Sequence, residues 1–119
     1  MQLRRKRAYD TAEAADGFRV LVDRLWPRGV SKDRAEIDLW AKDTAPSVDL
    51  RKAWHAASED EWGDYADRYR AELAGESAPA LNELAAAVKQ HEVVTLVYAA
   101  HDPEHNHAVV LEQALGELL

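Results

Sequence analysis

The sequence predicts an α/β fold: a small, mostly parallel sheet flanked by about four helices, in a single domain over residues 1–119. Two apolar runs, residues 20–22 and 94–98, are short and nearly continuous, which is typical of strands covered on both faces. Segments with apolar residues at helical spacing lie between and after these runs. This alternation favours parallel strands joined by right-handed connections.

Four strands are expected. Residues 3–9 are rich in lysine and arginine, which suits an edge strand because such charges discourage association between sheets. After a loop that ends at Gly17, residues 18–23 form the first buried strand. Residues 36–42 alternate polar and apolar side chains, which predicts a strand with one solvent-exposed face. Residues 93–99 form the second buried strand.

Four helices are expected from the signals at their ends. Their expected N-terminal capping residues are Ser47, Ser58, Ser77 and Asn106. Glu61 follows the second of these serines by three residues and completes a capping box. Gly75 ends the second helix, and Pro79 lies in the first turn of the third, where its missing N–H costs nothing.

The net charge of −7 hides an asymmetry along the chain. Residues 1–34 hold nine Lys and Arg against five Asp and Glu, whereas residues 35–119 hold six against seventeen. The acidic total argues against broad coating of nucleic acid, and the basic first third indicates a local anion site. The alternative is that the basic strand pairs with acidic helices of the same chain.

The chain has no cysteine, which excludes disulfides, thiolate catalysis and cysteine-rich zinc sites. Residues 1–7 are basic but lack the apolar stretch of a secretory signal, and no apolar run approaches the roughly 18 residues of a membrane span. We therefore expect a cytoplasmic protein that does not associate with a membrane.

Two polar runs, residues 23–29 and 102–107, follow closely on the two buried strands. If these strands are parallel neighbours, both runs emerge at the carboxyl edge of the sheet, where open α/β folds place their ligand sites. The sequence therefore predicts a binding site at this edge.

In the first run, the guanidinium groups of Arg24 and Arg28 are candidates to hold a phosphate or carboxylate through paired hydrogen bonds. Gly29 would let the backbone approach the ligand or adopt a positive φ, and Trp26 would wall the site. The alternatives are an ion pair between Arg24 and an acidic neighbour, and a core position for Trp26.

The third expected strand ends at Lys42 and Asp43, shortly before the helix that begins at Ser47. If this strand is parallel to the others, Lys42 joins the same edge, and the free amides of the helix N-terminus add a positive field. Ser47 would then be a ligand contact and Asp43 a proton-transfer group. The alternatives are a helix cap for Ser47 and a turn residue for Asp43.

The second run ends with Asn106 and His107 at the start of the last helix. A helix N-terminus favours the neutral imidazole, so His107 is a candidate general base or ligand hydrogen-bonding group, with Asp23 as a second proton-transfer candidate. Asn106 and the Tyr98 hydroxyl are further ligand-binding candidates. The alternatives are an N-cap for Asn106, a backbone hydrogen bond for His107 and a structural hydrogen bond for Tyr98.

A metal site is the other chemistry that this run suggests. The group of His101, Asp102, His105 and His107 is compact in sequence and contains zinc-ligand types. His101 and His105 are expected in a loop, where exposed histidines are common, so no metal site is predicted. The chain lacks a Gly-x-Gly-x-x-Gly motif, a Walker lysine loop and a Gly-x-Ser-x-Gly elbow, and no cofactor is predicted.

Several of these segments together resemble the YeaO-like family. The segments that carry the resemblance are residues 19–32, Trp40-Ala41-Lys42-Asp43, Ala45-Pro46-Ser47, Leu50-Arg51, Tyr69 with Glu72-Leu73, residues 96–100 and Asn106-His107-Ala108. They cover nearly the whole chain, and the first is long enough to be highly specific. The resemblance implies an α/β fold and a small cytoplasmic protein of bacteria or archaea, with no established reaction or cofactor.

Three functions remain open at this point. The first is a site for a small anionic ligand that bears a phosphate or carboxylate, nucleotides included, with or without catalysis. The second is a regulatory or nucleic-acid-associated module that uses the basic residues 4–7, without catalysis. The third is a structural subunit held by an internal network of Arg, Asp and Trp. The anionic-ligand site explains the largest number of the polar residues that are expected at one edge of the sheet.

Overall fold

The computed structural model describes residues 1–119 and contains one four-stranded sheet in the order β1-β4-β2-β3. The strands are β1 (Gln2–Arg7), β2 (Phe18–Leu21), β3 (Leu39–Trp40) and β4 (Val93–Tyr98). All neighbouring strands are parallel, so the two buried strands lie side by side as β2 and β4, and the charged strand β1 lies at an edge. The α/β prediction is confirmed.

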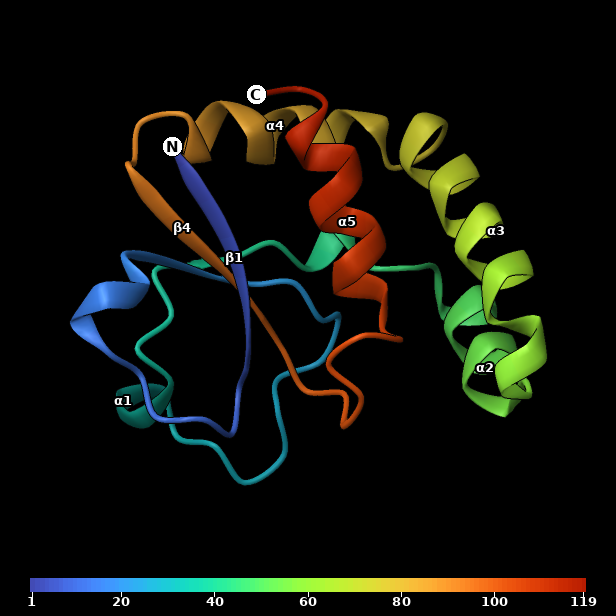
Figure 1. The fold of residues 1–119 in the computed structure, drawn as a ribbon, viewed down its shortest axis with the longest axis horizontal. Coiled ribbons are helices and arrows are strands. Elements are labelled where there is room, and N and C mark those ends of the chain that lie inside the picture. The colour runs from blue at the N-terminus through green and yellow to red at the C-terminus, as the bar shows by residue number, and fades with distance from the viewer.

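Five α-helices accompany the sheet: α1 (Lys32–Ala35), α2 (Val48–Ala56), α3 (Trp62–Ala74), α4 (Ala78–Val88) and α5 (His107–Gly116). Figure 1 shows α2 to α5 gathered on one side of the molecule, with the short α1 at the opposite end. Three single 3-10 turns, Ala14–Asp16, Lys42–Thr44 and Glu59–Glu61, lie in the connections. None of the helices is long and apolar enough to cross a membrane.

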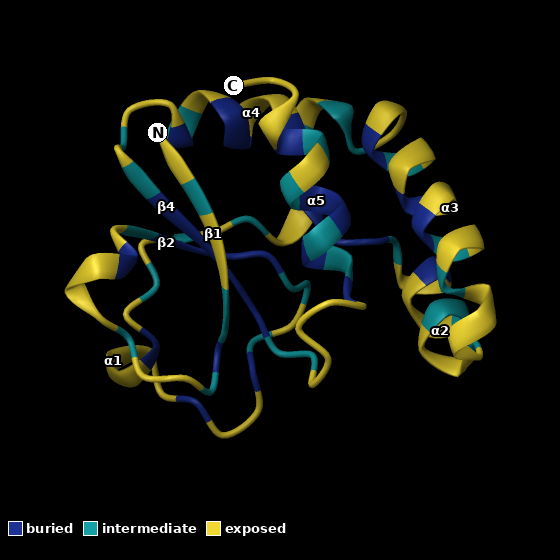
Figure 2. Cartoon of the chain, viewed as in Figure 1, coloured by how far each residue is buried: buried dark blue, intermediate teal, exposed yellow.

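The sheet is covered on both faces, as its continuous apolar strands predict. Val20, Val22 and Leu96 belong to the larger core cluster, which the apolar stripes of α3, α4 and α5 complete. The alternate residues Leu21 and Val97 point to the other face, into a smaller cluster. In Figure 2 the buried positions run along β4 and the inner sides of the long helices.

The expected helix ends are largely those observed. The Ser47 hydroxyl accepts a hydrogen bond from the Leu50 amide at 3.3 Å, and the Asn106 carboxamide oxygen accepts one from the Ala108 amide at 2.9 Å. A capping box joins Ser58 and Glu61, although it opens with a 3-10 turn before α3 begins. The side chain of Ser77 forms no capping hydrogen bond, because the backbone there is not extended as an N-cap requires.

Two elements differ from the prediction. The strand expected over residues 36–42 is only two residues long, because it pairs with β2 only through Leu39 and Trp40, and Glu36 just before it has a left-handed φ of 47°. Helix α1, which was not predicted, is a four-residue turn capped by Ser31 and too short to show an apolar period.

A buried ion pair fastens the start of β2 to its surroundings. The Asp16 carboxylate accepts a hydrogen bond from Arg19 Nη1 at 2.7 Å, while Arg19 Nε donates to the Ala35 carbonyl at 3.0 Å. Lys6 Nζ of β1 lies 3.2 Å from the same carboxylate, and the Glu13 amide donates to it at 3.0 Å. The pair therefore joins β1, β2, α1 and the turn before β2.

Removing Asp16 should destabilise the protein strongly. Asp16→Ala leaves the Arg19 guanidinium buried without its carboxylate, which costs about 3–5 kcal/mol of unfolding free energy. The control is the double variant Asp16→Leu with Arg19→Met, which removes both charges and should recover most of the loss. Urea denaturation measures both variants, and a double variant as unstable as the single one would contradict this account.

The contribution of Asp16 to the unfolding free energy should also depend on pH. Burial alone would raise the pKa of Asp16, but hydrogen bonds from Glu13, Lys6 and Arg19 outweigh it and lower the pKa below its ordinary value of 3.8. The stabilisation is therefore complete above about pH 4 and is lost as the pH falls through the lowered pKa. The stability gap between wild type and Asp16→Ala should narrow below pH 4, and a gap that widens there would contradict it.

Candidate functional site

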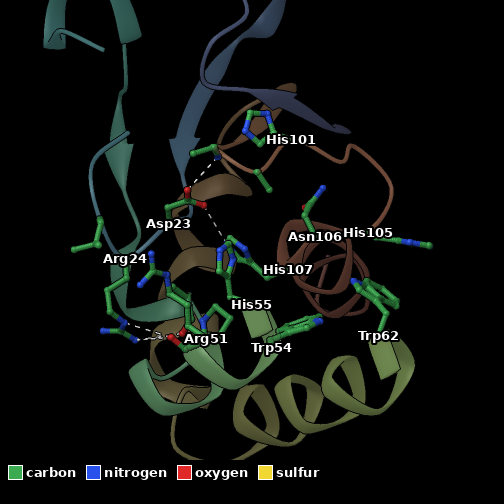
Figure 3. A pocket seen from close by; sticks show the side chains of 15 residues that line it. Asp23, Arg24, Arg51, Trp54, His55, Trp62, His101, His105, Asn106 and His107 are labelled. Carbon is green, nitrogen blue, oxygen red and sulfur yellow. Dashed lines mark hydrogen bonds and ion pairs between the residues drawn. The ribbon is translucent and has the colours of Figure 1, made fainter. Parts of the chain in front are cut away.

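A pocket of about 450 Å³ opens where the chain leaves β2 and β4. The segment after β2 runs towards β3, whereas the segment after β4 leads into α5, which packs against β1 and β4. A crevice between diverging connections at the carboxyl ends of parallel strands is the usual ligand site of such sheets. The lining comes from the exits of β2 and β4, from α2 and the segment before it, and from the starts of α3 and α5 (Figure 3).

Asp23 and His107 lie next to each other in the lining of this pocket. Asp23 Oδ2 accepts a hydrogen bond from the Ala99 amide at 3.0 Å, which joins the exits of the two central strands. Asp23 Oδ1 lies 3.2 Å from His107 Nε2, in the first turn of α5. The same nitrogen lies 3.1 Å from the carbonyl oxygen of Val22. Both side chains are mostly buried.

This geometry fixes one proton on His107. The carbonyl of Val22 can only accept a hydrogen bond, so His107 Nε2 must carry a hydrogen and donate it. Nδ1 then has no protein partner and is left for a ligand or solvent. The backbone contact anticipated as the structural alternative is thus present, together with the carboxylate.

Arg24 lies at the left of the pocket in Figure 3 and is held by backbone oxygens. Its Nε and Nη2 atoms donate to the Pro46 carbonyl at 3.3 Å, and Nη2 also donates to the Ala45 carbonyl at 3.3 Å. No carboxylate pairs with it, so its charge is not neutralised by an ion pair. These bonds leave Nη1 without a partner in the protein.

Helix α2 adds three side chains to the lining that sequence reasoning did not assign to the site. Arg51, Trp54 and His55 are three and four residues apart, which places them on one helical face. Arg51 is exposed and makes no hydrogen bond or ion pair with the protein. The sequence did contain a signal for these lining residues, because a cation and an imidazole flank a tryptophan that is expected in the core.

Aromatic rings form the wall on the right of Figure 3. The Trp54 and Trp62 rings lie 5.9 Å apart at 54°, and His105 stacks on Trp62 at 5.0 Å and 29°. Tyr69, whose ring lies 6.0 Å from that of Trp54, is fully buried, and its hydroxyl donates to the carbonyl of Thr44. Burial, followed by the nearby charge of Glu72, raises the pKa of Tyr69.

The lining is positive on an acidic protein. It contains two arginines, four histidines and one carboxylate, that of Asp23, whose Oδ2 accepts a hydrogen bond from the Ala99 amide while its buried Oδ1 lies 3.2 Å from His107 Nε2 without a hydrogen bond. With all histidines neutral its formal charge is +1, whereas the whole chain carries −7. The N-terminus of α5, marked by Asn106 and His107 in the lining, adds a partial positive charge.

The structure gathers four of the residues predicted for the site. Asp23, Arg24, Asn106 and His107 line the pocket. The other seven, which do not, are Trp26, Arg28, Gly29, Lys42, Asp43, Ser47 and Tyr98.

Three predicted site residues of the first polar run lie outside the pocket, in the loop that follows β2. Trp26 Nε1 donates to the Val30 carbonyl at 2.6 Å, and its ring meets that of Trp40 edge-on at 5.5 Å. Arg28 is exposed, with its carbonyl bound by the Tyr9 hydroxyl at 3.0 Å. Gly29 has a φ of 79°, the positive φ that the sequence predicts for a glycine there.

Three more residues lie elsewhere around the sheet. Lys42 is exposed with Nζ 5.3 Å from the ring of Trp40, and Asp43 is exposed in the adjoining 3-10 turn. Tyr98 ends β4 inside the larger core, and burial raises the pKa of its hydroxyl.

The N-terminus of α2 already has an anion of the protein's own. Glu72 of α3 accepts a hydrogen bond from the Ser47 amide at 2.8 Å and another from the Ser47 hydroxyl. The sequence prediction placed an external ligand near these amides, but Glu72 occupies the place, and its position 25 residues later gave no local signal. Ser47 therefore acts as the helix cap.

One group near the pocket has metal-ligand types. Atoms of Glu59, Asp102 and His105 lie within 4.8 Å of one another, and all three residues are exposed. His101 and His107 do not join them. Exposed acidic groups of this kind are common on protein surfaces, so the group does not define a metal centre.

Comparison with known proteins identifies relatives over nearly the full length. A family model described as "Inactive DUF488-N3 subclade" matches residues 2–119. The uncharacterized protein YeaO of Escherichia coli is 41% identical over 118 residues, which cover 99% of this chain and 100% of that protein. The uncharacterized protein Rv3073c of Mycobacterium tuberculosis is 40% identical over 115 residues, covering 97% and 94%. No solved structure matches.

Removing Glu72, the carboxylate that binds the N-terminus of α2, should lower the unfolding free energy more than removing the helix cap Ser47. Glu72→Ala leaves the Ser47 N–H without a partner and removes a negative charge from the helix N-terminus, which should cost about 1–3 kcal/mol. Ser47→Ala keeps the bond from the amide to Glu72 and should cost about 1 kcal/mol. Urea unfolding compares the two variants, and a loss from Glu72→Ala clearly smaller than that from Ser47→Ala would contradict this account.

Proposed function

The chain belongs to the DUF488-N3 family, in the subclade described as inactive, and we propose that its pocket binds a small ligand bearing a phosphate or carboxylate. The observation that carries the proposal is the lining itself. Two arginines line a pocket whose single carboxylate, that of Asp23, lies against the Ala99 amide and His107 and forms an ion pair with neither arginine. An anion is the ligand that would neutralise them at least cost in desolvation.

Arg51 is the group that contacts the anion in this proposal. Its guanidinium has no partner in the protein, and a planar fork of donors matches two oxygens of a phosphate or carboxylate. Arg24 is held in place by the carbonyls of Ala45 and Pro46 and presents Nη1 as a second donor. A guanidinium fixed beforehand loses little side-chain entropy on binding.

His107 and the start of α5 complete the anion site in this proposal. Because Nε2 donates to Val22 and faces Asp23, the ligand meets Nδ1, which accepts a hydrogen bond when neutral and donates one when protonated. The description of the subclade as inactive favours binding without turnover. Asp23 is therefore proposed to orient His107. Asp43 lies outside the pocket and has no role in the proposed binding.

The nucleic-acid alternative is less well supported because the basic strand is occupied within the chain. Arg5 pairs with Glu112 at 3.0 Å, and Lys6 pairs with Glu13 at 2.8 Å as well as with Asp16. Arg4 donates to the Ala15 carbonyl at 3.1 Å. The structural alternative accounts for Arg24 and its carbonyl partners, but it leaves the free guanidinium of Arg51 unexplained.

The proposal predicts anion binding that depends on Arg51. Isothermal titration with ribose 5-phosphate and with citrate should detect binding of at least one of them. Arg51→Ala should weaken it about tenfold or more, because a charge-assisted hydrogen bond contributes about 1.5–3 kcal/mol.

Lys52→Ala is the matched control, since it removes the same charge from the next residue of α2, which lies outside the pocket. Equal loss in the two variants would mean that only the overall charge matters. Absence of binding by both anions at millimolar concentration would refute the proposal.

A further inference from the structure

The aromatic wall of the pocket goes beyond what an anion alone requires. Trp54 and Trp62 are each half-buried, in contact with the core on one side and lining the pocket on the other. The remaining tryptophans, Trp26 and Trp40, pack against each other outside the pocket. The two indoles of the wall therefore border the pocket as well as the core.

A planar ring already lies on this wall. The His105 imidazole stacks on Trp62 at 5.0 Å and 29°, while its own side chain remains 44% exposed. The contact shows that the Trp62 face accepts a flat, nitrogen-containing ring from the loop after β4. Trp54, whose neighbours Trp62 and Tyr69 are tilted by 54° and 58°, has no ring stacked parallel to it.

The cation and the aromatic wall lie at a definite spacing. Arg51 and Trp54 are three residues apart on α2, so their Cβ atoms lie about 5–6 Å from each other on one helical face. A pentose is about long enough to join a phosphate at the first to a ring at the second. The volume of about 450 Å³ lies within the range of small-molecule sites and far exceeds the needs of a lone phosphate.

We propose that the pocket takes a nucleoside monophosphate, with the phosphate on Arg51 and Arg24 and the base against Trp54 and Trp62. This inference rests on the proposed anion site and adds the class of ligand. Stacking suits any base, because each has a π face, so the wall gives affinity for nucleotides in general. Selection among bases would fall to His101 and His105, polar side chains of the lining whose rings lie at its outer edge.

The test compares ligands that differ only in the base. Adenosine, cytidine, guanosine and uridine 5′-monophosphates each contain ribose 5-phosphate, so the ratio of their dissociation constants to that of ribose 5-phosphate isolates the ring. At least one nucleotide should bind about tenfold or more tightly than ribose 5-phosphate. Equal affinities would overturn this inference while leaving the anion site intact, and no binding of any of these phosphates would overturn both.

Substitutions on the wall locate the base. Trp62→Leu and, separately, Trp54→Leu should bring nucleotide affinity down to that of ribose 5-phosphate, while ribose 5-phosphate still binds as in the wild type and so reports an intact fold. Trp26→Phe and Trp40→Phe are controls outside the pocket and should leave the ratio unchanged. A preference for nucleotides that survives both leucine variants would place the base elsewhere and refute the assignment.

Discussion

The carboxylate of Asp23 holds together the parts from which the pocket is built. One oxygen receives the Ala99 amide and so fixes the exit of β4 against that of β2, while the other faces His107 at the start of α5. This one side chain thus touches the exits of both central strands and the first residue of α5. Arg24, the next residue, donates to the carbonyls of Ala45 and Pro46 in the segment just before α2.

Local signals in the sequence were sufficient for most of the scaffold. Apolar runs covered on both faces gave β2 and β4 as parallel neighbours, and the caps at Ser47 and Asn106 were read from residue type alone. The strand predicted over residues 36–42 was too long, since only Leu39 and Trp40 pair with β2, and the single turn α1 was missed because it is too short to show a period. Part of the site could be predicted from the sequence, because Asp23, Arg24, Asn106 and His107 follow strand ends. Arg51 and the Ser47–Glu72 hydrogen bond could not, because they depend on how the helices meet.

Two groups of positive side chains in the protein differ in their partners, those of β1 and the two arginines of the pocket lining. The basic first strand is largely consumed by internal partners, Glu112, Glu13 and Asp16, as the alternative interpretation of the sequence expected. The positive character that remains available is concentrated in a pocket contributed mainly by the acidic part of the chain. The charge asymmetry along the sequence therefore did not show where the unpaired arginines of the pocket would lie. Contacts between distant segments decide which arginines stay free.

The order of the strands has a consequence for how the chain reaches its native state. β4 is inserted between β1 and β2, so neither of the first two strands has its central neighbour until residues 93–98 have been synthesised. Sheet formation must then join residues that lie far apart along the chain, and such long-range contacts slow folding. During that interval the row of lysine and arginine on β1 keeps an unpaired strand from recruiting another chain, so its charges protect the nascent protein as well as the finished one.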